Sequence, residues 1–183
     1  MSVSAGLMFA RNMHRSSMMV RVEMTPPRYA QTLADIPSRE TLLSVSGLEF
    51  MEGMLHGRFP HAPIHHLMGY HLESVGPGRV SFRGQASLAH TNPVGSVHGG
   101  WYGTMLDSAL GCAVMTTVPQ GRWYTTLEYK VNLIRALPLE TEVIAEGIID
   151  HTGKTTAVAH ATIRGAADDK LYATGTTTCI ILT

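Results

Sequence analysis

Residues 98–114 read HGGWYGTMLDSALGCAV, and the one charged side chain among them is Asp107. Asp is a poor helix former, and burying its charge without partners is costly. Three interpretations are open. Asp107 could cap a second helix after a break, it could face a hydrated seam between subunits, or it could be a partly desolvated carboxylate kept for chemistry.

The apolar stretch around Asp107 extends over residues 99–118, which is about the length of a membrane span. Its central acid, its four glycines and the alternating segments on both sides argue against such a span. A helix that is apolar all round is otherwise buried all round. Gly103 and Gly111 lie on roughly one face and would let a strand or a partner helix approach closely. We therefore expect one long, buried central helix.

Alternating polarity predicts six strands around this helix. From Gly69 the period is two as far as a turn at Gly76-Pro77-Gly78, and it then continues to Ala86. Four further strand-like segments follow the helix, at residues 122–135, 142–150, 155–164 and 171–182. Strands grouped after a single helix favour an α+β fold with an antiparallel sheet, and the economical arrangement is a sheet curled around the helix.

Short helices are expected before this core. Ser38 can cap a helix over residues 39–45, and Ser46 with Glu49 forms a capping box that opens a second helix. Pro60 and Pro63 are expected to keep the chain that follows extended. The predicted organisation is an N-terminal extension and linker over residues 1–37, short helices over residues 38–66, and the main domain over residues 67–183.

The first 23 residues contain several Arg, Met and Ser and no acid before Glu23. Such a composition resembles a transit peptide. The alternative is an over-long start with Met24 as the first residue, and on composition we favour this alternative.

The composition excludes several classes of protein. Of 183 residues, 44% are hydrophobic and 15% charged, with 14 basic and 14 acidic side chains. A net charge of zero provides no strong field for nucleic acid or anionic lipid, so neither partner is expected. The low charge suggests surface buried against other chains. Cys112 and Cys179 have no CxxC spacing, which indicates buried thiols in a reducing, cytoplasmic environment.

The start of the helix offers a second chemical group. At His98-Gly99-Gly100, free backbone N–H groups and the positive end of the helix dipole gather, and such a start can polarise a carbonyl oxygen. Asp107 lies about seven residues further, roughly 10 Å along the axis. One chain therefore cannot easily supply both groups to one substrate, whereas two chains with antiparallel helices could. A two-fold dimer with two equal sites is the resulting hypothesis.

These residues resemble a known family. Asn92-Pro93-x-Gly95-x-x-His98-Gly99-Gly100 followed after six residues by Asp107 is similar to the hotdog-fold thioesterases of the phenylacetate-degradation (PaaI) type. The similarity continues through residues 111–113, 125–132 and 171–175 and covers roughly residues 67–182. It implies the hotdog fold, a homodimer, often as a dimer of dimers (a homotetramer), and hydrolysis of acyl-coenzyme A thioesters without metal or cofactor.

The resemblance also assigns roles to single residues. Gly99 matches the amide donor that polarises the thioester carbonyl, and Asp107 matches the catalytic carboxylate, acting as a base on water or attacking directly. Asn92 matches a residue that helps place the carbonyl or the water. Thr126 falls where some relatives carry a hydroxyl near the water, although a one-residue slip would exchange it with Thr125.

Further residues are candidates for substrate binding. Gly100 would let a ligand approach the backbone, and His98 either binds in the site or fixes the loop before the helix. Trp101 and Tyr102 either line an acyl pocket or pack in the core. Lys154, with Arg135, either contacts the phosphates of coenzyme A or is solvated surface charge.

Metal binding, acyl-CoA binding without turnover and enoyl-CoA hydration are the other functions considered for this sequence. The histidines between His56 and His71 are not expected to bind a metal, because Pro60 and Pro63 prevent a single helix face. An acyl-CoA-binding hotdog protein without turnover is the alternative function. An enoyl-CoA hydratase of related fold would need a His–Asp pair, and His98 and Asp107 are not spaced as one.

Overall fold

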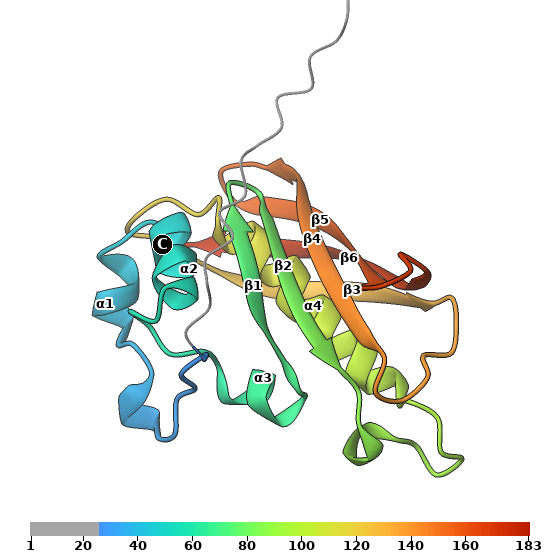
Figure 1. The fold of residues 1–183 in the computed structure, drawn as a ribbon. Helices are drawn as coiled ribbons and strands as arrows, with labels where there is room; N and C mark the ends of the chain where they lie inside the picture. The colour runs from blue at the N-terminus through green and yellow to red at the C-terminus, as the bar shows by residue number, and fades with distance from the viewer. Residues whose placement is uncertain (1–25) are drawn as a thin grey trace, which may run out of the picture.

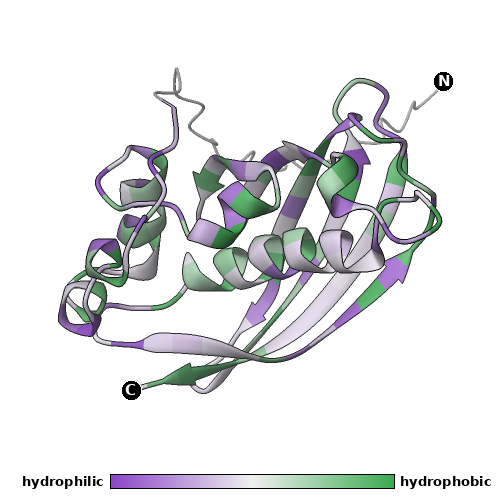
Figure 2. Cartoon of the chain, turned by 90° about the horizontal axis from the view of Figure 1, so that it is seen from below, coloured by the Kyte–Doolittle hydropathy of each residue, from purple (hydrophilic) through white to green (hydrophobic). Residues whose placement is uncertain are grey.

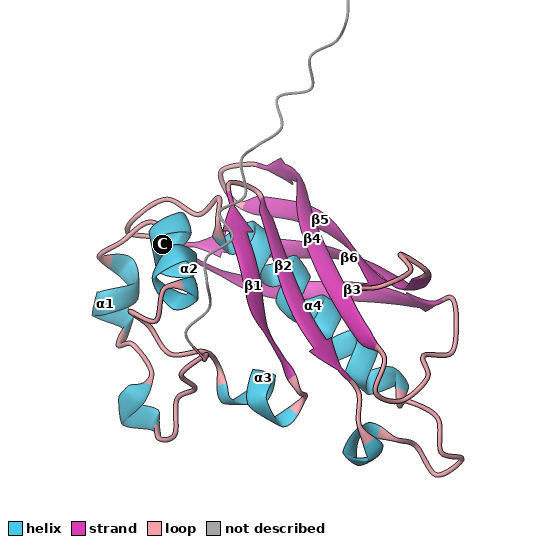
Figure 3. Ribbon diagram, in the orientation of Figure 1, coloured by secondary structure: helices cyan, strands magenta, loops and turns pink. Residues whose placement is uncertain are grey.

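The computed structural model describes residues 26–183 and contains one antiparallel sheet with helices at one end and against one face (Figures 1 and 3). The strands are β1 (Tyr70–Gly76), β2 (Arg79–Gln85), β3 (Trp123–Leu133), β4 (Glu142–Thr152), β5 (Thr156–Gly165) and β6 (Leu171–Leu182). The helices are α1 (Arg39–Leu43), α2 (Gly47–Leu55), α3 (Pro63–Leu67) and α4 (Gly99–Met115), with two 3-10 turns, η1 (Leu33–Asp35) and η2 (Leu88–His90).

The six strands pair in the order β1-β2-β4-β5-β6-β3, and all pairs are antiparallel. The predicted hairpin of β1 and β2 is confirmed, and Gly78 in its turn has a φ of +72°, a conformation that glycine adopts without steric cost. β3 follows α4 in sequence but pairs with β6, so β3 forms an edge of the sheet. The predicted α+β hotdog architecture is thereby confirmed.

The central helix α4 lies across the curved sheet and contacts β2, β3, β4, β5 and β6 (Figure 2). Met105, Leu106, Ala109 and Leu110 have no exposed surface, so the helix is the centre of the hydrophobic core. This confirms the expected buried helix. None of the helices in residues 26–183 is both long and apolar enough to cross a membrane.

The N-terminal helices pack at the far end of α4. The Ser46–Glu49 capping box is present, and the Gly47 amide donates to the Val118 carbonyl at 2.9 Å, just beyond the end of α4. Ser38 caps α1 as predicted. The chain at residues 63–67 is helical rather than extended, so that expectation was wrong: Pro63 occupies the first helical position, where its missing N–H has no partner to lose. The two interpretations of residues 1–23 concern a segment outside the described residues.

Candidate active site

One face of α4 meets the inner face of β3 in a regular seam. The helix presents Gly103, Asp107 and Gly111, which follow one another at intervals of four residues and therefore lie on one face. Three facing pairs make up this seam: Gly103 with Tyr129, Asp107 with Thr126, and Gly111 with Tyr124. The acid therefore lies between two positions at which a tyrosine approaches a glycine.

Asp107 lies inside an uninterrupted helix that extends eight residues before and after it. A helix break at this position, one of the three open interpretations, is therefore ruled out. The carboxylate is half-buried; burial raises its pKa, and hydrogen bonding from the Thr126 hydroxyl acts in the opposite direction. A carboxylate with a raised pKa is a stronger base as long as it is ionised.

Thr126, and not Thr125, faces the helix. Thr126 pairs with the buried Cys179 of β6, whereas Thr125 pairs with Ile180 on the outer face of the sheet and is exposed. The predicted register is thus the one that the strand adopts. An irregularity between Thr126 and Glu128 then shifts the alternation along the rest of β3.

The start of α4 has one amide without a partner. His98 is the N-cap, and its Nδ1 accepts a hydrogen bond from the Gly100 amide at 2.9 Å. The Gly99 amide donates to no other group in the described part of the chain. His98 therefore organises the helix start, and Gly99 presents a free N–H at the positive end of the helix dipole.

Asn92 orders the loop that leads to this helix start. Its side-chain Oδ1 accepts from the amides of Val94 and Ser96, both at 3.1 Å, and its backbone carbonyl accepts from Gly95. Only the side-chain amide group of Asn92 is left to meet a ligand. The role of Asn92 that the structure shows is therefore to order this loop.

Trp101 and Tyr102 are core residues. Trp101 is 1% exposed, and its indole N–H donates to the Met68 carbonyl at 2.8 Å. Tyr102 is 3% exposed, and its hydroxyl accepts from the Leu137 amide at 2.9 Å. Of the two interpretations of these aromatic residues, the structure favours core packing.

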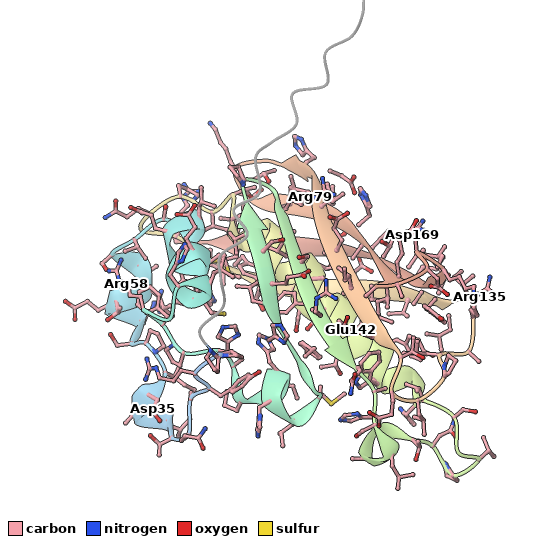
Figure 4. All side chains as sticks on the ribbon, viewed as in Figure 1. Asp35, Arg58, Arg79, Arg135, Glu142 and Asp169 are labelled. Atoms are coloured by element: carbon pink, nitrogen blue, oxygen red, sulfur yellow. The ribbon has the colours of Figure 1, made fainter. Side chains whose placement is uncertain are left out.

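Lys154 is remote from the helix start of its own chain. It is exposed in the turn between β4 and β5, and the neighbouring Thr152 hydroxyl lies 2.9 Å from that of Thr117, just past the C-terminal end of α4. Arg135 instead follows β3 and, with Val97 and Tyr102, lines a cavity of about 200 Å³ near the helix start. Figure 4 shows Arg135 at the end of the molecule away from the N-terminal helices.

Tyr124 is a residue of this seam that the sequence analysis did not single out. A Cβ placed on Gly111 would lie 2.6 Å from the Tyr124 hydroxyl oxygen, so the phenol occupies the space that Gly111 leaves. Its spacing in the sequence could have identified it, because Tyr124 lies two residues before Thr126 and therefore on the same face of the strand.

In residues 26–183, no three His, Cys, Asp or Glu side chains are grouped so that they could hold a metal ion. His61 and His65 are instead buried, with rings 6.1 Å apart, and the Nδ1 atom of each has no hydrogen-bond partner among the described residues.

The family model described as the thioesterase superfamily matches residues 94–172, which include Gly99, Asp107 and Thr126. This part of the chain is therefore similar to the thioesterase superfamily. Asn92 and the N-terminal helices lie outside the matched range.

Similar proteins include human acyl-coenzyme A thioesterase 13, which is 26% identical over 104 residues, covering 57% of this chain and 74% of the human protein. A thioesterase family protein from Silicibacter pomeroyi is 29% identical with a TM-score of 0.60, over 66% of this chain and 89% of that one. A phenylacetic acid degradation-related protein from Ralstonia eutropha is 26% identical with a TM-score of 0.66, over 72% of this chain and 98% of that one. The chain thus shares its fold with proteins of the type that the sequence resembles.

Proposed function

We propose that this protein hydrolyses acyl-coenzyme A thioesters to a free acid and coenzyme A. The similarity to the thioesterase superfamily and to an acyl-coenzyme A thioesterase supports such hydrolysis in general. The observation that carries the proposal is Asp107, a half-buried carboxylate with a raised pKa in the middle of a core helix. Aromatic, short-chain and medium-chain acyl groups are the substrates considered.

The proposed chemistry uses two groups of the protein. The Gly99 amide and the helix dipole polarise the thioester carbonyl, and a donor at this position contributes about 3 kcal/mol to transition-state stabilisation. Asp107 takes a proton from a water molecule, whose oxygen attacks the carbonyl carbon. The C–S bond then breaks, and the coenzyme A thiolate leaves and is protonated. Direct attack by Asp107, through an anhydride, is the alternative; incorporation of ¹⁸O from labelled water into the Asp107 side chain during a single turnover distinguishes the two.

The two groups come from different chains in this proposal. Gly99 and Asp107 are eight residues apart on one straight helix, about 12 Å along its axis, whereas both must lie within about 3 Å of the reacting carbonyl. Antiparallel pairing of two α4 helices brings the Gly99 of one protomer to the Asp107 of its partner. The residue halfway between them is Gly103, so the two-fold axis of such a pair would pass near that position.

The open edge of the sheet also favours a dimer. β3 is an edge strand, and Leu127, Tyr129 and Leu133 on it are 58%, 45% and 55% exposed. An apolar, unpaired edge is a site for pairing with another strand, and a second copy would extend the sheet across the axis. We propose this homodimer as the active unit, with a dimer of dimers as the larger assembly.

The remaining candidates have supporting roles. Thr126 orients the Asp107 carboxylate or the attacking water through its hydroxyl, and the free amide of Asn92 approaches the carbonyl or the water of the site. Arg135 lies near the helix start and is the better placed of the two basic residues for a coenzyme A phosphate within one chain. Lys154 would reach such a phosphate only from the partner protomer.

The test is the release of thiol from a panel of acyl-CoA esters by the wild type and by Asp107→Asn. We expect the wild type to release thiol and the variant to lose about 10²–10⁴-fold in kcat while still binding acyl-CoA. A wild type that binds acyl-CoA but releases no thiol would support the alternative, a binding protein without turnover.

A second experiment tests the shared site. The Gly99→Pro variant is mixed with the Asp107→Asn variant under conditions in which protomers exchange between dimers. In a mixed dimer one site combines the intact Gly99 of one chain with the intact Asp107 of the other, so about a quarter of the wild-type activity returns. A site built within one chain predicts no recovery.

A further inference from the structure

Tyr124 packs against α4 one helical turn beyond Asp107. Its phenol oxygen lies where a Gly111 side chain would begin, and Gly111 is one helical turn beyond Asp107. A Cβ on Gly111 would also lie 3.4 Å from Cζ and 3.5 Å from Cε2 of the same ring. The tyrosine therefore fills the seam between α4 and β3 immediately after the proposed catalytic acid.

The surroundings of Tyr124 are suited to an apolar group. The ring is half-buried and packs on the core, with the Trp123 ring 5.9 Å away. Burial and the neighbouring Cys112, Cys179 and Asp107 raise the pKa of the Tyr124 phenol, so it is uncharged at neutral pH. No hydrogen bond joins its hydroxyl to another side chain or backbone group in residues 26–183.

The opposite end of the seam is different. There Tyr129 approaches Gly103, with its hydroxyl oxygen 3.5 Å from a Cβ placed on that glycine, and the Tyr129 side chain is 45% exposed. This end lies toward the two-fold axis of the proposed dimer, from which the partner's Gly99 amide would reach the thioester carbonyl beside Asp107. A polyanionic coenzyme A moiety requires solvent and positive charge, whereas an acyl group is stabilised by apolar surroundings. The acyl group is thus directed toward Tyr124.

We propose that Tyr124 is a specificity-determining residue that ends the acyl pocket and restricts this protein to short acyl groups. This inference rests on the proposed function and deepens it, because it names the substrate class of the same site. Each methylene that the pocket accepts contributes about fourfold to affinity through burial. Methylene groups that would collide with the Tyr124 ring add no affinity.

The experiment measures binding and turnover across chain length. Non-hydrolysable ketone analogues of acetyl-, butyryl-, hexanoyl-, octanoyl- and decanoyl-CoA are titrated into wild type, Tyr124→Ala and Tyr124→Phe, and kcat/KM is measured for the matching thioesters. The matched control is Thr125→Ala, which changes the exposed neighbour on the outer face of the same strand.

For the wild type, we expect affinity to rise with the first methylenes and then to stop rising or fall. Tyr124→Ala should bind the octanoyl and decanoyl analogues at least tenfold more tightly than the wild type and the acetyl analogue no more tightly. Tyr124→Phe, which keeps the ring, should show a smaller change, and Thr125→Ala should keep the wild-type profile.

A second variant covers the case in which Tyr124→Ala does not fold. Gly111→Ala pushes a methyl group against the Tyr124 hydroxyl and should shift the length limit to shorter chains. In the double variant with Tyr124→Ala, the methyl group added at Gly111 refills part of the space that the lost ring leaves. The longest acyl chain that still gains affinity should then be shorter than in Tyr124→Ala alone.

The outcomes separate this inference from the proposed function. Hydrolysis with a chain-length profile that neither Tyr124 nor Gly111 variants alter overturns the inference and leaves the function standing. Binding with the expected length dependence but without thiol release overturns the function and supports the pocket. Failure of every analogue to bind the folded proteins overturns both.

Discussion

The backbone of Gly147 on β4 passes directly against the Ala109 carbonyl of α4, with no room for a side chain between strand and helix. Ala109 is fully buried and lies two residues after Asp107. Contact of the sheet backbone with the helix backbone at this point holds the acid-bearing turn of α4 at a defined depth in the sheet.

Gly147→Ala is therefore expected to destabilise the protein. The added methyl would collide with backbone atoms that cannot rotate away, and overpacking of this kind costs about 1–3 kcal/mol or more. Urea unfolding measures the free energy. The control is Gly121→Ala: Gly121 has a φ of +79° and open space around its Cα, so that change costs only the left-handed backbone penalty of about 1 kcal/mol. Equal losses in both variants would contradict the close contact.

Gly99→Pro tests the amide donor without removing the helix start. Proline is tolerated at the first helical position, and His98 before it has the extended conformation (φ −65°, ψ 138°) that a following proline requires. We expect kcat to fall about 10²–10³-fold because the carbonyl loses its donor, with little change in thermal stability. Gly99→Ala adds a Cβ but keeps the N–H, and it should retain most activity. Equal losses in both variants would indicate that space, and not the amide, matters at this position.

Thr126→Val is expected to move the acidic limb of the pH–rate profile to higher pH. Burial already raises the pKa of Asp107, and the Thr126 hydroxyl opposes that rise by bonding the ionised form. Loss of the hydroxyl leaves the carboxylate protonated up to a higher pH, so the base form and the activity appear later as pH increases. The profile of kcat/KM is the measurement, and Thr125→Val, on the exposed face, should show no shift. An unmoved limb in Thr126→Val would argue that another group controls the profile.

The buried histidine His65 predicts loss of stability in acid. It packs between the rings of Tyr70 and Phe82, and burial, with the nearby His61, lowers its pKa to about 4. In the unfolded chain the imidazole takes up a proton near its usual pKa of 6.5, so as pH falls from 6.5 to about 4 the unfolded state binds a proton that the folded state does not. Between pH 7 and pH 5 this one histidine costs the fold about 2 kcal/mol.

His65→Leu should therefore be less sensitive to acid than the wild type. Melting temperatures at pH 7 and pH 5 provide the comparison, and the decrease should be smaller in the variant. His151→Leu, at an exposed position on β4, is the control and should keep the wild-type decrease. If both variants lose stability as the wild type does, His65 is not the group responsible.

Much of the fold was predictable because its signals are local. The capping box of Ser46 and Glu49 and the alternation of the strands report on hydrogen bonds and faces within a few residues of chain. The helix at residues 63–67 was missed because Pro63 was interpreted as a break, whereas its position at the first turn makes it a start.

The sequence by itself determined the buried helix with its single acid and the free amide at Gly99, since periodicity and the geometry of a helix end depend only on neighbouring residues. Only the tertiary structure decided that Tyr124 lies over Gly111, that Trp101 and Tyr102 bond to backbone groups of the core, and that Lys154 lies at the far end of α4. These relationships join residues distant in the chain, and their geometry depends on how closely the sheet packs against the helix.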